Sequence, residues 1–253
     1  MNRRIDIKLF DFPTKEEMLP LFKKSPLYEY NLKQEVFERE DLDIYEQVLN
    51  YSPIMRDRVN LLNSKIFQIN LSYAYVSYYF QRGIPDDFDS LKHITNEQAT
   101  SRVHFQHHTD SFFQRAFTTL DLLARLLFDY FGLEANPERN GTDITFKGVL
   151  YMLPQREKKL FRKLVSVKKS KEFKIASDVR NDIIHNNPPY RMHIREEVIN
   201  GVKFTKSVYF SSEKLMKIMN DFLWSIKKIF EIVKNYISNK KRNSMQLANA
   251  IKN

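Results

Sequence analysis

Cysteine is absent from the 253 residues, and glycine and proline are scarce, with 5 and 9 copies. A chain without cysteine has no disulfide scaffold, no thiolate zinc site and no cysteine nucleophile. So little glycine argues against Gly-rich phosphate loops, collagen-like repeats and turn-dense β-sandwiches. No apolar run approaches the roughly 20 residues that span a bilayer, and the N-terminal segment lacks the continuous apolar stretch of a signal peptide. We therefore expect a soluble, cytoplasmic protein without a membrane anchor.

The composition instead favours a folded, basic protein. Hydrophobic residues make up 42% of the chain and aromatic residues 13%, enough to bury a sizeable core. Lysine and arginine number 41 against 31 acidic residues, giving a formal charge of +10. Such an excess indicates a polyanion as partner, such as RNA, DNA or a nucleotide. A generally lysine-rich proteome would produce the same excess.

Helical periodicity dominates the pattern of apolar residues. Spacings of three and four predict long helices over about 57–82, 101–131, 171–185 and from 211 or 212 to about 235, with shorter ones at 15–24, 146–152 and 155–167. Gly83, Gly132 and the Pro188-Pro189 pair mark helix ends. Residues 136–142 are expected to form a polar turn, and the basic tail after Asn235 is expected to fray.

One β-hairpin interrupts the helices. The dipeptide Asn200-Gly201 is a strong hairpin-turn signal because both residues tolerate positive φ, and it joins segments 190–199 and 202–210. The sequence therefore predicts a mainly α-helical bundle with one β-hairpin inserted before the last long helix.

The stretch with the most chemistry is Arg180-Asn181-Asp182-Ile183-Ile184-His185, at the end of the helix predicted over 171–185. Arginine carries a permanent charge and a planar set of donors suited to phosphate. Histidine titrates near neutral pH, and at the last turn of a helix the macrodipole favours its protonated form. The alternative interpretation is a surface arginine followed by a histidine that binds the carbonyls at its own helix end.

RNA cleavage by 2′-hydroxyl attack needs a base, a phosphate-holding cation and an acid, all of which these side chain types supply. Five residues on a helix separate Arg180 and His185 by roughly 140° and about 7.5 Å along the axis. One chain has one histidine in this motif, whereas acid and base roles together require two. A two-fold dimer would present each residue twice.

Arg180-Asn181 followed by His185, near the end of a basic helical bundle, resembles the HEPN superfamily (higher eukaryotes and prokaryotes nucleotide-binding). Its signature is arginine, four to six residues, then histidine, with a polar residue commonly after the arginine. The resemblance implies a HEPN-like domain over 101–253, preceded by an N-terminal helical region, 1–100, that is packed on or continuous with it. It also implies a homodimeric, metal-independent endoribonuclease without a cofactor, or a related module that only binds RNA, nucleotides or proteins. Many members are toxins or defence proteins, so a neutralising antitoxin would be a further partner.

Under this resemblance Arg180 holds the scissile phosphate and His185 acts as general base or acid. Asn181 orients the imidazole or contacts the phosphate, and the Asp182 carboxylate fixes Arg180 or faces water. The predicted RNA-attracting rim consists of basic residues directly before and within the motif helix: Lys168, Lys169, Lys171 and Lys174.

A second cluster, of histidines, allows a different interpretation of the chain's function. His104 and His108 lie four residues apart, hence on one helical face, as paired histidine ligands of zinc or iron do. A metal site would need a third ligand, such as His193 or Asp121. The alternatives are a polar helix entrance with exposed imidazoles, or a residue that assists the Arg180–His185 site.

Overall fold

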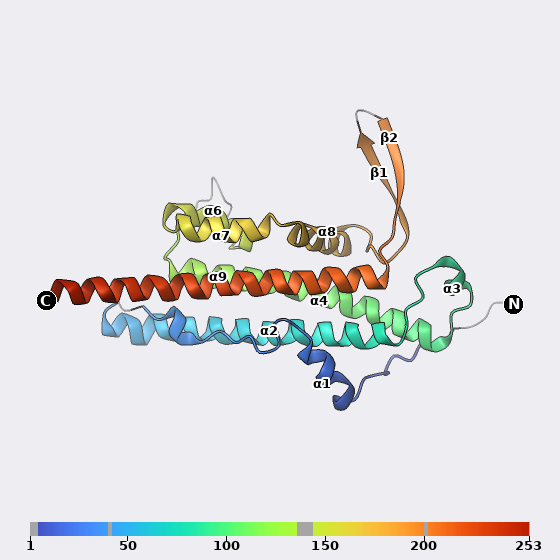
Figure 1. The fold of residues 1–253 in the computed structure, drawn as a ribbon, viewed down its shortest axis with the longest axis horizontal. Coiled ribbons are helices and arrows are strands. Elements are labelled where there is room, and N and C mark those ends of the chain that lie inside the picture. The colour runs from blue at the N-terminus through green and yellow to red at the C-terminus, as the bar shows by residue number, and fades with distance from the viewer. Residues whose placement is uncertain (1–4, 40–41, 136–143, 200–201, 253) are drawn as a thin grey trace. The chain divides into compact units, whose positions relative to one another are not determined.

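The computed structural model describes residues 5–39, 42–135, 144–199 and 202–252. Its elements in chain order (Figure 1) are α1 (Lys15–Lys23), a 3₁₀ turn (Gln34–Phe37), a π-helical turn (Glu46–Tyr51), α2 (Ser52–Gln81), α3 (Phe88–Lys92), α4 (Asn96–Tyr130), α6 (Phe146–Met152), a second 3₁₀ turn (Leu153–Gln155), α7 (Lys158–Lys168), α8 (Lys171–His185), β1 (His193–Ile199), β2 (Val202–Val208) and α9 (Ser212–Lys252). The predicted fold class is confirmed: the protein is mainly α-helical, with one antiparallel hairpin before the last long helix.

The chain forms two compact units, each assembled from three separate stretches of sequence. Unit 1 contains Met1–Tyr28, Gln68–Arg115 and Lys171–Leu223, and unit 2 contains Glu29–Phe67, Ala116–Ser170 and Trp224–Asn253. The long helices α2, α4 and α9 each contribute one part to both units. The division at residue 100 expected from the sequence stays a prediction.

Unit 1 has a core of aromatic and aliphatic side chains from the second half of α2, the first half of α4, α8 and the start of α9. Its buried members include Tyr73, Val76, Tyr79, Phe105, Phe112, Phe113, Phe173, Ala176, Val179, Leu215, Met219 and Phe222. The Phe173 ring meets the Phe222 ring edge-on, with centroids 5.4 Å apart, so α8 is packed on the first part of α9.

Unit 2 buries a mainly aliphatic core. Its members include Leu62, Ile66, Leu120, Leu123, Leu127, Val149, Leu153, Leu160, Leu164, Ile226, Ile229, Phe230 and Val233. These residues recur at helical spacings of three and four, which places them on the apolar faces of α2, α4, α6, α7 and α9.

The predicted start of the second long helix, near residue 101, is wrong. α4 begins at Asn96 because Thr95 and Gln98 form a capping box: the Gln98 amide donates to Thr95 Oγ1 at 3.1 Å, and the Thr95 amide donates to Gln98 Oε1 at 3.1 Å. The first long helix also begins earlier than predicted, at Ser52, where it directly continues the π-helical turn that ends at Tyr51.

The prediction that the chain frays after Asn235 is also wrong, since α9 continues to Lys252. Tyr236 and Lys240, one turn apart, both bind the buried carboxylate of Glu157, the residue before α7; the Tyr236 hydroxyl donates to Glu157 Oε2 at 2.5 Å. A buried carboxylate without partners would be costly, so these contacts hold the last part of α9 against the start of α7 within unit 2.

The helix ends predicted at two glycines are confirmed: Gly83 and Gly132, which follow α2 and α4, have φ of 87° and 53°. At the start of α1, Thr14 forms a capping box with Glu17. In the hairpin His193 pairs with Val208 and Ile199 pairs with Val202. The predicted Asn200-Gly201 turn and the predicted polar turn over 136–142 lie outside the described residues.

Candidate functional site

The predicted motif occupies the last turns of α8, whose observed bounds, Lys171–His185, match the predicted ones. The helix is amphipathic and buries one face: Phe173, Ala176 and Val179. It ends after His185 because the residue before Pro188 is pushed out of helical geometry. The motif therefore lies at the end of a helix whose other face is packed in unit 1.

Arg180 lies at the edge of the packed face and is half-buried. Its Nη1 donates to Oδ1 of Asn181 at 3.1 Å. Asn181 itself is exposed, whereas the Nε atom of Arg180 is buried. The predicted contact of Asn181 with His185 or a phosphate stays a prediction, because the contact described is with Arg180.

His185 is exposed, and no residue in the described part of the chain makes a hydrogen bond to its imidazole. The five residues from Arg180 turn the helix by roughly 140°, so the two side chains leave it in different directions. The structure thus places a half-buried cation and an open imidazole on the same two turns without a described contact between them.

Asp182 binds a residue that the sequence did not single out. Arg195 of β1 donates from Nη2 to Oδ1 of Asp182 at 2.5 Å, and Nδ2 of Asn186 donates to the same oxygen at 3.1 Å. The Asp182 side chain is only 14% exposed. Its described role is therefore to join the last turn of α8 to the hairpin.

An open groove of about 350 Å³ lies between the end of α8 and the hairpin. Its lining includes Asp182, Asn186, Asn187, His193 and Arg195. The Nδ1 atom of His193 is 3.0 Å from the carbonyl oxygen of Arg191. The sequence did not predict that His193 and Arg195 share a groove with Asp182 of the motif, because no fixed spacing links a helix end to the strand that follows it. The only available signal was their place on the first predicted strand after the motif.

The base of the hairpin is anchored close to the motif. Tyr190, 5% exposed, donates from its hydroxyl to both carboxylate oxygens of Asp110 on α4 at 2.7 Å. Burial raises the pKa of the Tyr190 hydroxyl, and the hydrogen bond to Asp110 raises it further. The Phe210 amide donates to the Pro189 carbonyl at 2.8 Å, which closes the other side of the base. Both ends of the hairpin are therefore fixed within unit 1.

The four predicted rim lysines divide between the two units. Lys168 and Lys169 end α7 in unit 2, whereas Lys171 and Lys174 begin α8 in unit 1. Lys171 and Lys174 are exposed, and by helical geometry they lie within roughly 40° of His185 around the axis. These two lysines therefore share the exposed face of α8 with the motif histidine.

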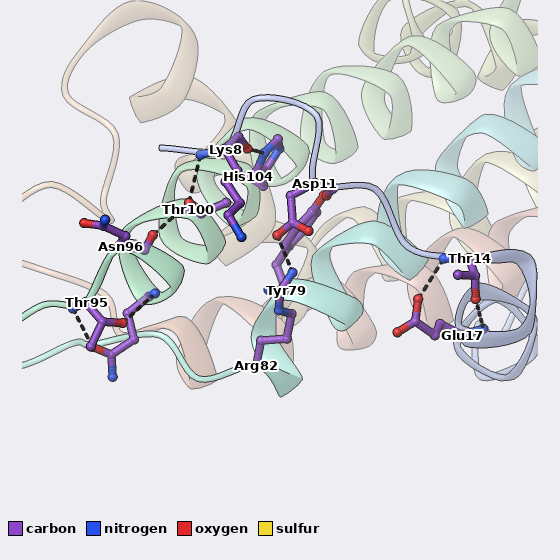
Figure 2. A network of polar contacts seen from close by, with 11 residues as sticks. Lys8, Asp11, Thr14, Glu17, Tyr79, Arg82, Thr95, Asn96, Thr100 and His104 are labelled. Atoms are coloured by element: carbon purple, nitrogen blue, oxygen red, sulfur yellow. Dashed lines mark hydrogen bonds and ion pairs between the residues drawn. The ribbon is translucent and has the colours of Figure 1, made fainter. Parts of the chain in front are cut away.

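His104 and His108 lie on one face of α4 as predicted, with ring centroids 6.4 Å apart. Both rings stack on Tyr79, at 4.7 Å and 5.8 Å. His104 Nε2 donates to the Lys8 carbonyl at 3.0 Å, and the Lys8 amide donates to Thr100 Oγ1 at 3.1 Å, so this cluster holds the N-terminal segment (Figure 2). Figure 2 also shows Tyr79 and Arg82 reaching Asp11 of the same segment.

The surroundings of His108 favour a neutral ring. Burial, and after it the nearby positive groups of His107, His104 and Arg115, together lower its pKa to about 4. The described residues contain no group of three or more histidine, aspartate or glutamate side chains that could hold a metal ion. The proposed third ligands are engaged elsewhere: Asp121 accepts the Phe146 amide at 2.8 Å. The structure therefore gives no support to a metal centre at His104 and His108.

A separate cavity of about 660 Å³ lies within unit 2. Its charged lining residues are Arg39, Arg156, Lys240, Lys241, Glu38 and Glu157. The Glu157 carboxylate is paired with Lys240, so cations exceed carboxylates around this cavity.

A comparison with protein families identifies the fold. The sequence matches the model of the Cthe2314-like HEPN family over residues 59–241, more than half of the chain, and the protein belongs to this HEPN family. No curated protein and no solved structure matches it. Within the described residues, no helix is both long and apolar enough to cross a membrane.

Proposed function

We propose that this HEPN protein is a metal-independent endoribonuclease that acts as a homodimer, with Arg180 and His185 as catalytic residues. The observation that carries the proposal is the exposed imidazole of His185 at the end of α8, two turns or less from the Arg180 guanidinium. An imidazole open to solvent can exchange protons with a bound substrate.

In this reaction a base removes the proton of an RNA 2′-hydroxyl, and the 2′ oxygen attacks the adjacent phosphorus. The bond from phosphorus to the 5′ oxygen breaks, and an acid protonates that oxygen. The products are a 2′,3′-cyclic phosphate and a 5′-hydroxyl. The Arg180 guanidinium would stabilise the charge that develops on the phosphoryl oxygens, and His185 would transfer a proton, with its twin in the second copy taking the other role.

The remaining predicted site residues have supporting roles in the proposal. Asn181, which accepts a hydrogen bond from Arg180, would direct the guanidinium toward the phosphate. Asp182 would act through Arg195 rather than on the substrate. Lys171 and Lys174 would attract the RNA backbone along the exposed face of α8, and a contribution of Lys168 and Lys169 stays a prediction from the sequence.

The test is cleavage of a labelled RNA by purified wild-type protein and by the Arg180→Ala and His185→Ala variants. Removing an acid–base group slows such reactions by about 10²–10⁴, so we expect no detectable cleavage by either variant. Arg125→Ala and His93→Ala, which alter exposed residues of other helices or loops, are matched controls and should cleave like wild type. Persistent cleavage by the His185→Ala protein, or inhibition by EDTA, would refute the mechanism.

One observation favours the second candidate, a HEPN module that binds an anionic ligand without cleaving it. The cavity in unit 2 has an excess of cationic side chains over carboxylates and a volume typical of ligand sites. If RNA or nucleotide affinity survives His185→Ala but falls with Arg156→Ala, and wild-type protein cleaves no RNA, binding is the better account.

A further inference from the structure

We infer that the cavity of about 660 Å³ in unit 2 binds a small molecule that carries phosphate groups, and that this ligand holds the last part of α9 in place. The cavity is lined by residues of unit 2, whereas the Arg180–His185 motif belongs to unit 1. The inference does not rest on the proposed cleavage of RNA. It deepens the second candidate function, because it names the class of ligand and its effect on the fold.

The cavity brings together four stretches of unit 2 that are far apart in the sequence. They are residues 38–39, the end of α4 at 130–132, the residues before α7 at 156–157, and residues 240, 241 and 244 of α9. The volume lies in the range of small-molecule sites, roughly 300–1,000 Å³. A ligand that contacts all four stretches would therefore join α9 to three segments that precede it in the chain.

The charges around the cavity favour an anion with about two negative charges. Four cationic side chains and two carboxylates line it: Arg39, Arg156, Lys240 and Lys241, against Glu38 and Glu157. The Glu157 carboxylate already accepts the Tyr236 hydroxyl at 2.5 Å and is paired with Lys240. A phosphate monoester has a charge of about −1.5 to −2 near pH 7 and three acceptor oxygens on one centre. One phosphate group thus matches the excess of two cations.

Arg156 is the lining residue best placed to bind a phosphate. It is exposed, and its guanidinium makes no hydrogen bond or ion pair with any residue in the described part of the chain. Its Nη1 atom lies 4.0 Å from the point where a Cβ atom on Gly132 would be, so the guanidinium lies beside the end of α4. A guanidinium can donate two parallel hydrogen bonds to one phosphate.

The lysines of α9 add charge from the other end of the chain. Lys241 donates from Nζ to the Glu35 carbonyl at 2.7 Å, and a carbonyl has no net charge, so this hydrogen bond positions the ammonium without neutralising it. Lys240 Nζ lies 5.4 Å from the centroid of the Phe131 ring, which is only 7% exposed and gives the cavity an apolar wall. A phosphate bound by both Arg156 and Lys241 would hold α9 to the stretch before α7.

The experiment measures binding to the full-length protein by isothermal titration calorimetry at fixed ionic strength. The probes are pyrophosphate, ATP and succinate, a dicarboxylate. We expect one site per chain for pyrophosphate or ATP, and for succinate an affinity at least about tenfold lower, the loss of roughly one charged hydrogen bond. Tighter binding of ATP would indicate a phosphorylated organic ligand, and tighter binding of pyrophosphate an inorganic one.

Variants of the lining residues identify the site. Arg156→Ala and Lys241→Ala should each weaken phosphate-probe binding by about tenfold or more, whereas Glu38→Gln, which removes a negative charge, should strengthen it. Arg162→Ala and Lys234→Ala alter exposed residues of α7 and α9 outside the described lining and should bind like wild type. Saturating pyrophosphate or ATP should also slow amide hydrogen exchange in residues 236–252, since a ligand that binds only the folded state stabilises it.

Three results would overturn the inference: wild type that binds neither phosphate probe, succinate that binds as tightly as they do, or unchanged binding by Arg156→Ala and Lys241→Ala proteins with native circular dichroism. Glu38→Gln keeps the test open if those two variants fail to fold, because weaker binding by Glu38→Gln would also contradict the inference. An RNA oligonucleotide whose affinity falls in Arg156→Ala while neither probe binds would assign the cavity to RNA instead. Cleavage of RNA without probe binding would leave the proposed function standing alone, and probe binding without cleavage would do the reverse.

Discussion

The hydrogen bond between Tyr190 and Asp110 sets how firmly the groove is held, and Tyr190→Phe tests it. The change removes the hydroxyl that donates to both Asp110 oxygens at 2.7 Å and adds no bulk. A hydrogen bond to a charged group contributes about 1.5–3 kcal/mol. For a chain of this size, a loss of that magnitude lowers Tm by roughly 3–12 °C.

The loss of stability caused by Tyr190→Phe should depend on pH in a defined direction. Burial raises the pKa of Asp110 above 3.8, and the Tyr190 hydrogen bond opposes that rise by stabilising the carboxylate. Without the hydroxyl, the pKa of Asp110 in the folded state rises further. A protonated Asp110 no longer needs a donor, so Tyr190→Phe should destabilise the protein at pH 7 and destabilise it less as the pH falls toward 4.

The assay is thermal and urea unfolding of wild type, Tyr190→Phe, Asp110→Asn and the double variant, followed by far-ultraviolet circular dichroism at pH 7 and pH 4.5. Tyr209→Phe, which removes a part-buried hydroxyl that donates to another carboxylate, Asp86, is the matched control for loss of a phenol. It should not show coupling to Asp110→Asn. A coupling energy between Tyr190 and Asp110 below about 0.5 kcal/mol, the scatter for independent sites, would refute the reasoning. An effect of Tyr190→Phe that grows on acidification would do so as well.

Three further predictions follow from contacts described above or in the same units. His108, with a pKa lowered to about 4, stays neutral in the folded chain while the unfolded chain takes up a proton below pH 6.5. Stability should therefore fall between pH 6.5 and 4, by at most about 1.4 kcal/mol per pH unit, and His108→Gln should flatten that slope in urea titrations; an unchanged slope contradicts this. Asp86 accepts the Ser212 amide at 2.8 Å and the Ser212 hydroxyl at 2.6 Å at the start of α9. Asp86→Ala should lower the free energy of unfolding by about 2 kcal/mol or more, and a loss below 0.5 kcal/mol in chemical unfolding would be inconsistent with this role. Glu157→Ala should speed amide hydrogen exchange in α9 beyond residue 235 by at least about tenfold, whereas equal protection in variant and wild type would show that Lys240 does not depend on Glu157.

The sequence predicted the parts of the fold that are set by local signals, such as a regular spacing of apolar residues. Helical periodicity and the double proline located α8 with its observed bounds, and the Asn200-Gly201 dipeptide located the two strands on either side of it, because all of these are local signals. The start of α4 was missed although Thr95 and Gln98 carry its capping box in the sequence. The end of α9 could not be found locally, since the polar residue Lys240 is held by a carboxylate far away in the sequence, Glu157.

The residues of the candidate site also divide into those that local signals predicted and those that depend on tertiary packing. Arg180 and His185 were found because their spacing lies within one helix. The positions of His193 and Arg195, which share a groove with Asp182, depend on how the chain turns after the double proline and on the contact of Tyr190 with α4, 80 residues earlier in the sequence. Asp182 was expected to fix Arg180 or face water, and the contacts described show it bound to Arg195 and Asn186 instead. Side-chain partners across elements follow from tertiary packing, which periodicity does not encode.

Because each unit is assembled from three separate stretches of sequence, the order of synthesis also limits when each unit can fold. A growing chain that has reached Ser170 holds two of the three stretches of both units and neither complete one. The motif helix is made next, but Phe173 has no Phe222 to pack against until the first half of α9 has followed. Long-range closure of this kind delays folding. The end of α8 that carries the motif is therefore among the last parts to be fixed, because unit 1 is complete only when the chain has been made as far as Leu223.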